Sequence, residues 1–415
     1  MRYLFGFACV CALGVVPAVG IGGCAAGCDR QCNTAVDCND SNECTQDACD
    51  AASGTCSNTP VANGAICEVG ACQSGSCEPI ASMFPCTEQG IRDAIAAGGG
   101  PHAFDCVAAT TVTTETQIEI DNDVILDGQG KLAVNGNSTH RVFFVPTNVT
   151  AELRRLTVSG GATNFSGGGI WNYGTLTLAG CVVSENTADF VGGGISNGDS
   201  ANEGGELTII DSTVTGNTSG LVGGIANSWG ALTVMNTTVA GNAGGGLGND
   251  VEGTATVTNT TVSGNTGGWG GGVDNLGSLT LVNCTVSGNF TDFDGVVRGI
   301  RNLEFAQGTL TVINTLVDGD CRGDITSGSD NIESPGDTCG FDQPTDQVNV
   351  SADDLKLGEL ADNGGPTMTH ALGADSVAID QIPAVDCVVT EDQRGVTRPQ
   401  GPACDVGSVE VGPAL

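Results

Sequence analysis

Side chains that could carry acid–base chemistry are unevenly distributed along this chain. General acid–base catalysis needs two or more ionisable groups that are held close together. Residues 160–297 contain no Lys, Arg or His, and their acidic residues do not recur at one position of the sequence pattern. No Ser/His/Asp or Cys/His grouping stands out either. The sequence therefore predicts no catalytic residue and no cofactor-binding residue. The nearest Arg residues lie at the two ends of this stretch: Arg154, Arg155, Arg298 and Arg301.

The 20 Cys residues predict disulfide chemistry instead. Ten of them lie in residues 24–77, a density typical of small modules that are held together by disulfides in an oxidising compartment. Their pairing cannot be deduced from spacing. Three further bridges are predicted, one of which flanks a short helical segment: Cys86 with Cys106, Cys321 with Cys339, and Cys387 with Cys404.

Calcium is the metal that the Cys-rich segment could hold. Ca²⁺ is bound by carboxylate and amide oxygens, and such side chains cluster here. No EF-hand loop is present, and the absence of a C-x-x-C pair in this segment disfavours zinc. A structural Ca²⁺ and a metal-free module both remain open. The candidate ligands are Asp37, Asn39, Asp40, Asn42 and Asp47.

Residues 167–320 repeat two short phrases and predict the fold. The first phrase reads GGGIWN and returns as GGGISN, GGIAN, GGGLGN, GGGVDN and RGIRN; the second resembles TLTLAGCVVSEN throughout. The last residue of the second phrase recurs every 23 to 31 residues, which indicates a solenoid whose coils lean on one another. Because the units consist of Gly, Thr, Val, Asn and Ser, each coil is expected to contain two or three short strands. We predict a parallel β-helix of about nine to eleven coils.

Asn recurs at two positions of the coil. Stacked coils place equivalent residues about 4.8 Å apart, so each Asn amide can bond to the next and form a ladder. We assign both ladders a structural role. The first contains Asn186, Asn217, Asn242, Asn265 and Asn289. The second contains Asn172, Asn197, Asn227, Asn249, Asn275 and Asn302.

Aromatic side chains gather in or beside the Gly-rich phrases. Aromatic rings on one side of a β-helix can stack on sugars, whereas the alternative role is packing within loops. The aromatic residues concerned are Trp171, Trp229, Trp269, Phe165, Phe190, Phe290 and Phe293.

The two ends of the repeat region differ from its centre. Residues 87–97 predict a helix that is capped by Thr87 and that places Ile91 and Ile95 on one face, where it could cover the open end of the first coil. We expect residues 321–415 to form an irregular, acidic cap, in which Asp392 and Arg394 can pair. We predict four segments: an export signal in residues 1–23, a Cys-rich module in 24–80, the β-helix with its N-terminal cap in 81–320, and the C-terminal cap in 321–415.

Three resemblances extend this interpretation. The paired GGGI and T-G-N phrases resemble the repeats of polymorphic outer-membrane proteins, although Val replaces their Phe. LGELADNGGPTMTHAL, SVAID and CVVTEDQRGVTRPQGPACDVGSVE resemble the C-terminal region of choice-of-anchor Q domain proteins, which implies a right-handed β-helix at the bacterial surface. The phrase CNTAVDCNDSNECTQDACDAASGTC resembles the Cys-rich repeats of slime-mould matrix proteins.

Residues 1–23 predict an export signal, because Arg2 precedes an apolar run and small residues. The tetrapeptide Ile21-Gly22-Gly23-Cys24 resembles a bacterial lipobox, which would make Cys24 a lipidated residue. The alternative is a simple signal-peptidase cut. A lipidated Cys24 would leave nine Cys in the module, so the even count favours the second alternative.

The charge limits the partners. A net charge of −35 repels nucleic acid and anionic membranes, so we expect no nucleic-acid partner and membrane contact only through an N-terminal lipid. We predict an extracellular or surface-attached monomer with a structural or adhesive role that binds a glycan or another surface protein. The alternative function is that of a polysaccharide lyase or hydrolase. A lyase would need Arg or Lys beside three acids on one coil face, and the sequence does not reveal such a group.

Overall fold

The chain forms two units, which are considered separately. The computed structural model describes residues 38, 42, 44–50, 55–60, 66–67, 70–73, 75–198, 204–267, 270–291, 298–303 and 308–412. In the smaller unit, Cys38 and Cys56 form a disulfide with a Cα–Cα distance of 5.3 Å. Strands β1 (Thr45–Asp50) and β2 (Thr55–Pro60) pair there. The export signal and Cys24 lie outside the described residues.

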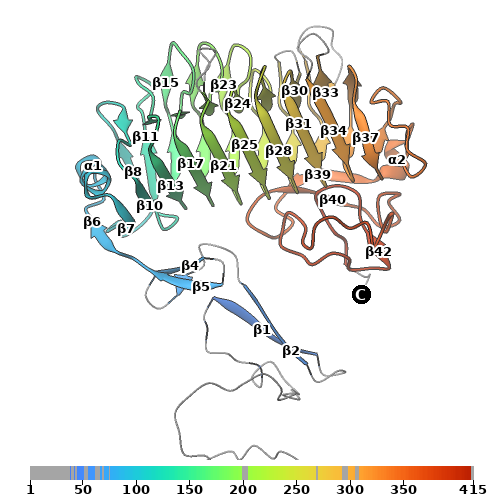
Figure 1. The fold of residues 1–415 in the computed structure, drawn as a ribbon, viewed down its shortest axis with the longest axis horizontal. Helices are drawn as coiled ribbons and strands as arrows, with labels where there is room; N and C mark the ends of the chain where they lie inside the picture. The colour runs from blue at the N-terminus through green and yellow to red at the C-terminus, as the bar shows by residue number, and fades with distance from the viewer. Residues whose placement is uncertain are drawn as a thin grey trace, which may run out of the picture. The chain divides into compact units, whose positions relative to one another are not determined.

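The larger unit is a parallel β-helix, which confirms the predicted fold (Figure 1). Each complete coil contributes one strand to each of three sheets of 11, 10 and 9 strands. We name these the eleven-, ten- and nine-stranded sheets. Strands of successive coils pair in parallel with matching register: for example, Ile170 lies beside Ile195, and Ile195 beside Ile225.

The eleven-stranded sheet contains β6 (Ser82–Phe84), β7 (Gly99–Phe104), β10 (Val124–Asp127), β13 (Thr150–Arg154), β17 (Thr175–Ala179), β21 (Glu206–Ile210), β25 (Ala231–Met235), β28 (Thr254–Thr258), β31 (Ser278–Val282), β34 (Thr309–Ile313) and β37 (Thr326–Ser329). The ten-stranded sheet contains β8 (Thr110–Thr113), β11 (Leu132–Asn135), β14 (Thr157–Ser159), β18 (Val182–Ser184), β22 (Thr213–Thr215), β26 (Thr238–Ala240), β29 (Thr261–Ser263), β32 (Thr285–Ser287), β35 (Leu316–Asp318) and β38 (Ile332–Ser334). The nine-stranded sheet contains β9 (Ile118–Glu119), β12 (Phe143–Val145), β16 (Ile170–Asn172), β20 (Ile195–Asn197), β24 (Ile225–Asn227), β27 (Leu247–Asn249), β30 (Val273–Asn275), β33 (Arg298–Asn302) and β36 (Asp320–Arg322).

Two three-stranded sheets and two pairs of strands complete the described strands of this unit. β15 (Ala162–Thr163), β19 (Thr187–Ala188) and β23 (Thr218–Ser219) pair in parallel beside the coils. β3 (Ile66–Cys67), β4 (Gly70–Gln73) and β5 (Ser76–Pro79) form an antiparallel sheet ahead of the β-helix. β39 (Leu357–Ala361) pairs with β40 (Thr369–Leu372), and β41 (Ile382–Pro383) pairs with β42 (Ala403–Cys404).

The core is a continuous column of aliphatic side chains. In every strand of the nine-stranded sheet from β12 to β30, the first residue points inward and is at most 1% exposed. The Val residues that replace Phe in the second phrase are equally buried, so a smaller side chain still closes the core. These are Val183, Val214, Val239, Val262 and Val286.

The Asn positions form continuous hydrogen-bonded ladders. Asn186 Nδ2 donates to Asn217 Oδ1 at 2.9 Å, and the same bond recurs down the column to Asn289. In the second ladder Asn172 Nδ2 donates to Asn197 Oδ1 at 2.7 Å, and the series continues to Asn302. Every Asn between these ends is fully buried, so the ladders satisfy polar groups that the sharp bends would otherwise leave without partners.

A helix covers the first coil. α1 (Glu88–Ala97) begins at Thr87, whose hydroxyl accepts from Gly90 N at 3.1 Å, and its Ile91 and Ile95 join the core. Cys86 and Cys106 form a disulfide beside it, with a Cα–Cα distance of 5.1 Å. Among the described residues, no helix is long and apolar enough to cross a membrane.

The C-terminal region lies differently from the predicted end cap. The β-helix continues for one coil past residue 320, through β36, β37 and β38, and the disulfide of Cys321 with Cys339 joins this coil to the segment that covers it. The chain then forms α2 (Ala352–Leu355) and turns back along the outer face of the ten-stranded sheet (Figure 1). Cys387 and Cys404 are joined by a disulfide within this returning segment. The segment therefore covers a side of the coils and not only their end.

Candidate functional site

The outer face of the nine-stranded sheet carries side chains of three kinds. The strand register places one outward residue per coil in a single row, because side chains alternate across a strand. After Glu119, aromatic residues occupy the first part of the row, small residues the middle, and charged residues the far part. In order the row reads Glu119, Phe144, Trp171, Ser196, Ala226, Gly248, Asp274, Arg301 and Arg322.

The aromatic part of the row is a cluster of half-buried rings. The centroids of Trp171 and Tyr173 are 5.1 Å apart, and Phe144 lies 5.9 Å from Trp171 and 6.0 Å from Tyr173. Such tilted and edge-on contacts are favourable for aromatic pairs. The rings therefore support one another and present a firm aromatic surface.

Arg141 holds this cluster from one side. Its guanidinium carbon lies 4.4 Å from the centre of the Trp171 ring, and its nitrogens donate to the carbonyl oxygens of Gly167 and Ser166, both at 2.8 Å. Burial lowers the pKa of Arg141 to about 10, and the neighbouring Tyr173 acts in the opposite direction. At neutral pH the residue stays charged, so the cation–π contact is maintained.

A pocket of about 460 Å³ lies over the small and charged parts of the row. Its floor includes Ala226 and Gly248, and apolar side chains from the flanking loops form most of its walls. Position 248 requires glycine, because an added Cβ would lie 2.5 Å from a methyl group of Val222. This volume is within the range of ligand pockets. The wall residues are Val191, Leu221, Val222, Leu276 and Leu303.

An ion pair closes the floor of the pocket. Arg301 Nε and Nη2 donate to the two carboxylate oxygens of Asp274 at 2.7 and 2.6 Å, and both residues are at most 8% exposed. Burial raises the pKa of Asp274, while the hydrogen bonds from Arg301 act in the opposite direction. Arg322 also lines the pocket and is exposed. The exposed Asp250 lines the pocket as well, so the lining combines mostly apolar walls with four charged side chains.

Two of the five predicted metal ligands, Asn42 and Asp47, lie in the described part of the chain, and they belong to different units. Asn42 uses its side chain in a turn, where Oδ1 accepts from Cys44 N at 3.0 Å and Nδ2 donates to Gly75 O at 2.6 Å. Asp47 lies in β1, and Asp37, Asn39 and Asp40 lie outside the described residues. Within the residues described, no group of three or more His, Cys, Asp or Glu is arranged to hold a metal ion.

The two repeat cysteines occupy a third polar column. Cys181 and Cys284 are buried free thiols, and burial raises the pKa of each to about 12. Elsewhere in the same column Ser or Thr hydroxyls accept from the backbone of the preceding coil, as when Ser212 Oγ accepts from Cys181 N at 3.0 Å. These thiols are therefore protonated at neutral pH and have little nucleophilic character.

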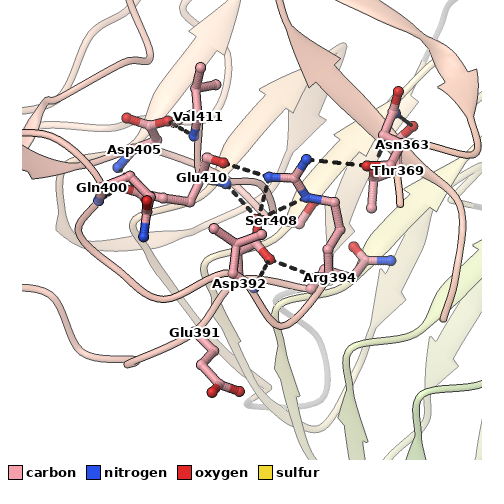
Figure 2. A network of polar contacts seen from close by, with 12 residues as sticks. Asn363, Thr369, Glu391, Asp392, Arg394, Gln400, Asp405, Ser408, Glu410 and Val411 are labelled. Carbon is pink, nitrogen blue, oxygen red and sulfur yellow. Dashed lines mark hydrogen bonds and ion pairs between the residues drawn. The ribbon is translucent and has the colours of Figure 1, made fainter. Parts of the chain in front are cut away.

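The returning C-terminal segment holds a network of buried carboxylates (Figure 2). Asp392 accepts from Arg394 Nε and Nη2 at 2.9 and 2.7 Å and from Glu410 N at 2.8 Å. Glu410 accepts from Arg398 and from the backbone nitrogens of Gln400 and Asp405. Because the donors are Arg side chains and backbone N–H groups, this network fixes loops and offers no open carboxylate to a substrate.

The structure also brings together a Ser and a His that the sequence did not suggest as a group. His370 Nδ1 lies 2.7 Å from Gly358 O and its Nε2 lies 2.9 Å from Ser263 Oγ. Since a carbonyl only accepts, Nδ1 carries the proton and Nε2 accepts from the hydroxyl. Both residues are at most 6% exposed, so the contact anchors the returning segment to β29.

Comparisons with known proteins found one family match and one similar solved structure. A family described as the Dictyostelium (slime mold) repeat matches residues 37–61, a small part of the chain. No curated protein matches the sequence. The crystal structure of pectate lyase Pel9A is similar with a TM-score of 0.44 and 14% identity, over 80% of this chain and 96% of that chain. At this score and identity the similarity indicates nothing about the activity of this chain.

Proposed function

We propose that this protein is an exported β-helix protein that binds glycans along the outer face of its nine-stranded sheet without cleaving them. The observation that carries the proposal is the continuous row on this face, in which a firm aromatic cluster leads to an apolar pocket of about 460 Å³. Aromatic rings and aliphatic walls suit the apolar faces of sugar rings.

The surroundings of the pocket favour binding over catalysis. Asp274 is engaged by both nitrogens of Arg301 that face it, so its oxygens already accept strong hydrogen bonds. A general acid or base must instead be within reach of a proton on the substrate. The disulfides suit a protein that acts outside the cytoplasm, and we propose the bacterial surface or the extracellular space as its location, reached through the export signal in residues 1–23.

The test uses the purified mature protein on an array of plant, algal and bacterial glycans. We expect binding by the wild type and a loss of at least tenfold in affinity for Ala226→Leu, which fills the pocket floor. The matched control is Thr256→Leu, which also introduces a Leu side chain but on the exposed outer face of the eleven-stranded sheet. Equal binding by the wild type and Ala226→Leu would remove this face from the proposal.

The alternative of a lyase is measured in the same preparation. The protein is incubated with pectate, alginate and chondroitin, with and without Ca²⁺, and the ultraviolet absorbance of unsaturated sugar ends is followed. We expect no increase. Turnover of any of the three substrates would replace the binding function with an enzymatic one.

A further inference from the structure

The outer face of the eleven-stranded sheet carries an unbroken row of Thr side chains. In six successive strands, from β17 to β34, the central residue points outward and is Thr, and the parallel register pairs each Thr with the next. No register shift interrupts these pairings, so the row is evenly spaced and about 24 Å long by the strand spacing. Its members are Thr177, Thr208, Thr233, Thr256, Thr280 and Thr311.

Strand propensity alone does not explain this row. Thr is favoured on exposed strands, but Val, Ile and Tyr are favoured as well, and the preference acts on every outward position of a strand. The outward positions that flank the row vary from coil to coil. One of them holds Glu206, Ala231 and Thr254 in successive coils, and the other holds Ile210 and then Met235. Only the central position keeps one residue type through all six coils.

The hydroxyl groups of the row are available to an external partner. A Thr hydroxyl can donate one hydrogen bond and accept two. Within the described part of the chain, none of the six hydroxyls bonds to a protein group. The ten-stranded sheet differs, because the returning segment bonds to its outward hydroxyls. Thr261 Oγ1 donates to Gln393 Oε1 at 2.6 Å, and Ser263 Oγ lies 2.9 Å from His370 Nε2.

The face is nearly free of charge in a strongly acidic protein. Each of the six strands turns three residues outward, and Glu206 is the one charged residue among them. The whole chain, in contrast, has a net charge of −35. None of these outward residues is aromatic, so a sugar ring has nothing to stack on here. The face therefore suits an uncharged partner that offers hydrogen-bonding groups in a regular array.

The spacing of the hydroxyls indicates which array this is. On the prism face of hexagonal ice, water molecules repeat at a distance close to the strand spacing of about 4.8 Å. Waters that are held by successive Thr hydroxyls therefore take positions that the ice lattice also requires. Beside the row, Thr254, Ser278 and Thr309 widen the array over three coils, where Ser278 Oγ lies 3.1 Å from Thr309 Oγ1.

From these observations we propose that the outer face of the eleven-stranded sheet is an ice-binding surface. Water molecules on the Thr row become part of the crystal as it grows, so the adsorbed protein stops the growth of that ice face. This function is independent of glycan binding, which uses the nine-stranded sheet, and either function can fail alone.

The test measures the growth of ice directly. Single ice crystals are observed in a solution of the purified mature protein, and the thermal hysteresis is recorded as the gap between the melting and the growth temperature. A slowly growing ice hemisphere then shows whether the protein enters the ice or stays in the liquid. We expect the wild type to show thermal hysteresis, to shape the crystals and to enter the ice.

Substitutions in the row separate this face from the rest of the protein. Thr256→Leu places a larger side chain without a hydroxyl in the row, so we expect at least a tenfold loss of thermal hysteresis. Because Thr256 is exposed, the unfolding midpoint should be unchanged. The matched control is Thr111→Leu, the same exchange at an exposed position of β8 in the ten-stranded sheet, which should retain the hysteresis. Thr280→Leu repeats the test one coil further if the midpoint of Thr256→Leu falls.

The outcomes distinguish this surface from the proposed function. Absence of thermal hysteresis in the wild type, or equal hysteresis in the wild type and both row variants, would overturn the ice-binding surface and leave glycan binding untouched. Adsorption to crystalline cellulose or chitin that Thr256→Leu loses, without adsorption to ice, would make the face a glycan-binding surface instead. Loss of glycan binding in Ala226→Leu with unchanged hysteresis would confirm that the two functions use different faces.

Discussion

The Asp274–Arg301 ion pair places two charges beneath an apolar pocket, where each depends on the other. Removing one partner of a buried pair leaves an uncompensated charge and costs about 3–5 kcal/mol, whereas replacing both partners by apolar groups costs far less. We therefore expect Arg301→Met to lower the free energy of unfolding by about 3 kcal/mol. Urea denaturation of Arg301→Met, Asp274→Leu and the double variant measures the coupling. If the double variant lost as much free energy of unfolding as the two single variants together, the coupling would be contradicted.

Asp405 makes the stability of the returning segment depend on pH. Burial raises its pKa to about 6, although the backbone N–H groups of Asp380 and Val411 act in the opposite direction. The folded state then binds the proton more readily than the unfolded state, so this residue contributes more stability as the pH falls from 7 towards 4. We expect the wild type to gain stability relative to Asp405→Asn over that interval. Urea denaturation at several pH values gives the difference, and a difference that does not vary with pH would contradict the assignment.

At the scale of the strand and turn, the first Asn ladder is the element on which the coils depend. Asn242 Oδ1 accepts from the backbone and side-chain nitrogens of Asn217, and its Nδ2 donates to Val214 O and Asn265 Oδ1. Asn242→Ala leaves several buried polar groups without partners, each at a cost of about 1–3 kcal/mol. We expect a loss of about 3 kcal/mol or more in the free energy of unfolding. The control is Asn164→Ala in an exposed loop. If both variants lost similar amounts of unfolding free energy, the ladder would not be what stabilises the coils.

The same repeats explain how far the sequence predicts the structure. The ladders, the inward Val residues and the capping helix follow from local spacing, because each coil pairs with the next in register. The signal for the Asp274–Arg301 pair was also present, since VDN and IRN are the same position of the first phrase in adjacent coils. The aromatic row could have been found in the same way from IWN. Comparing residues at one phrase position would have located the pocket floor.

Other contacts could not be predicted by that comparison. His370 meets Ser263 across 107 residues, and Gln393 meets Thr261 across 132. The returning segment has no repeat, so its sequence contains no register that relates it to a coil.

At the scale of the whole β-helix, the returning C-terminal segment ties together coils that otherwise contact only their neighbours. Solenoid stability is approximately a sum of local terms, so a segment that spans several coils adds cooperativity. Gln393 forms several of the hydrogen bonds between the returning segment and the coils. Its Nε2 lies within hydrogen-bond distance of Thr237 O, Thr238 Oγ1 and Thr367 Oγ1 at 3.2, 3.1 and 2.9 Å, and its Oε1 accepts from Thr261 Oγ1 at 2.6 Å.

Gln393→Ala should therefore release the returning segment while the coils remain folded. Hydrogen exchange is expected to rise in residues 357–411 and in the covered strands β26 and β29, because loss of the side chain leaves buried groups on both sides without partners. Strands β12 and β16, far from the contact, should exchange as in the wild type. The control is Gln400→Ala, whose amide nitrogen donates to the nearby Thr397 O in an exposed turn. Uniform acceleration along every coil would mean that the segment is part of one cooperative fold, and unchanged exchange would mean that Gln393 does not hold it.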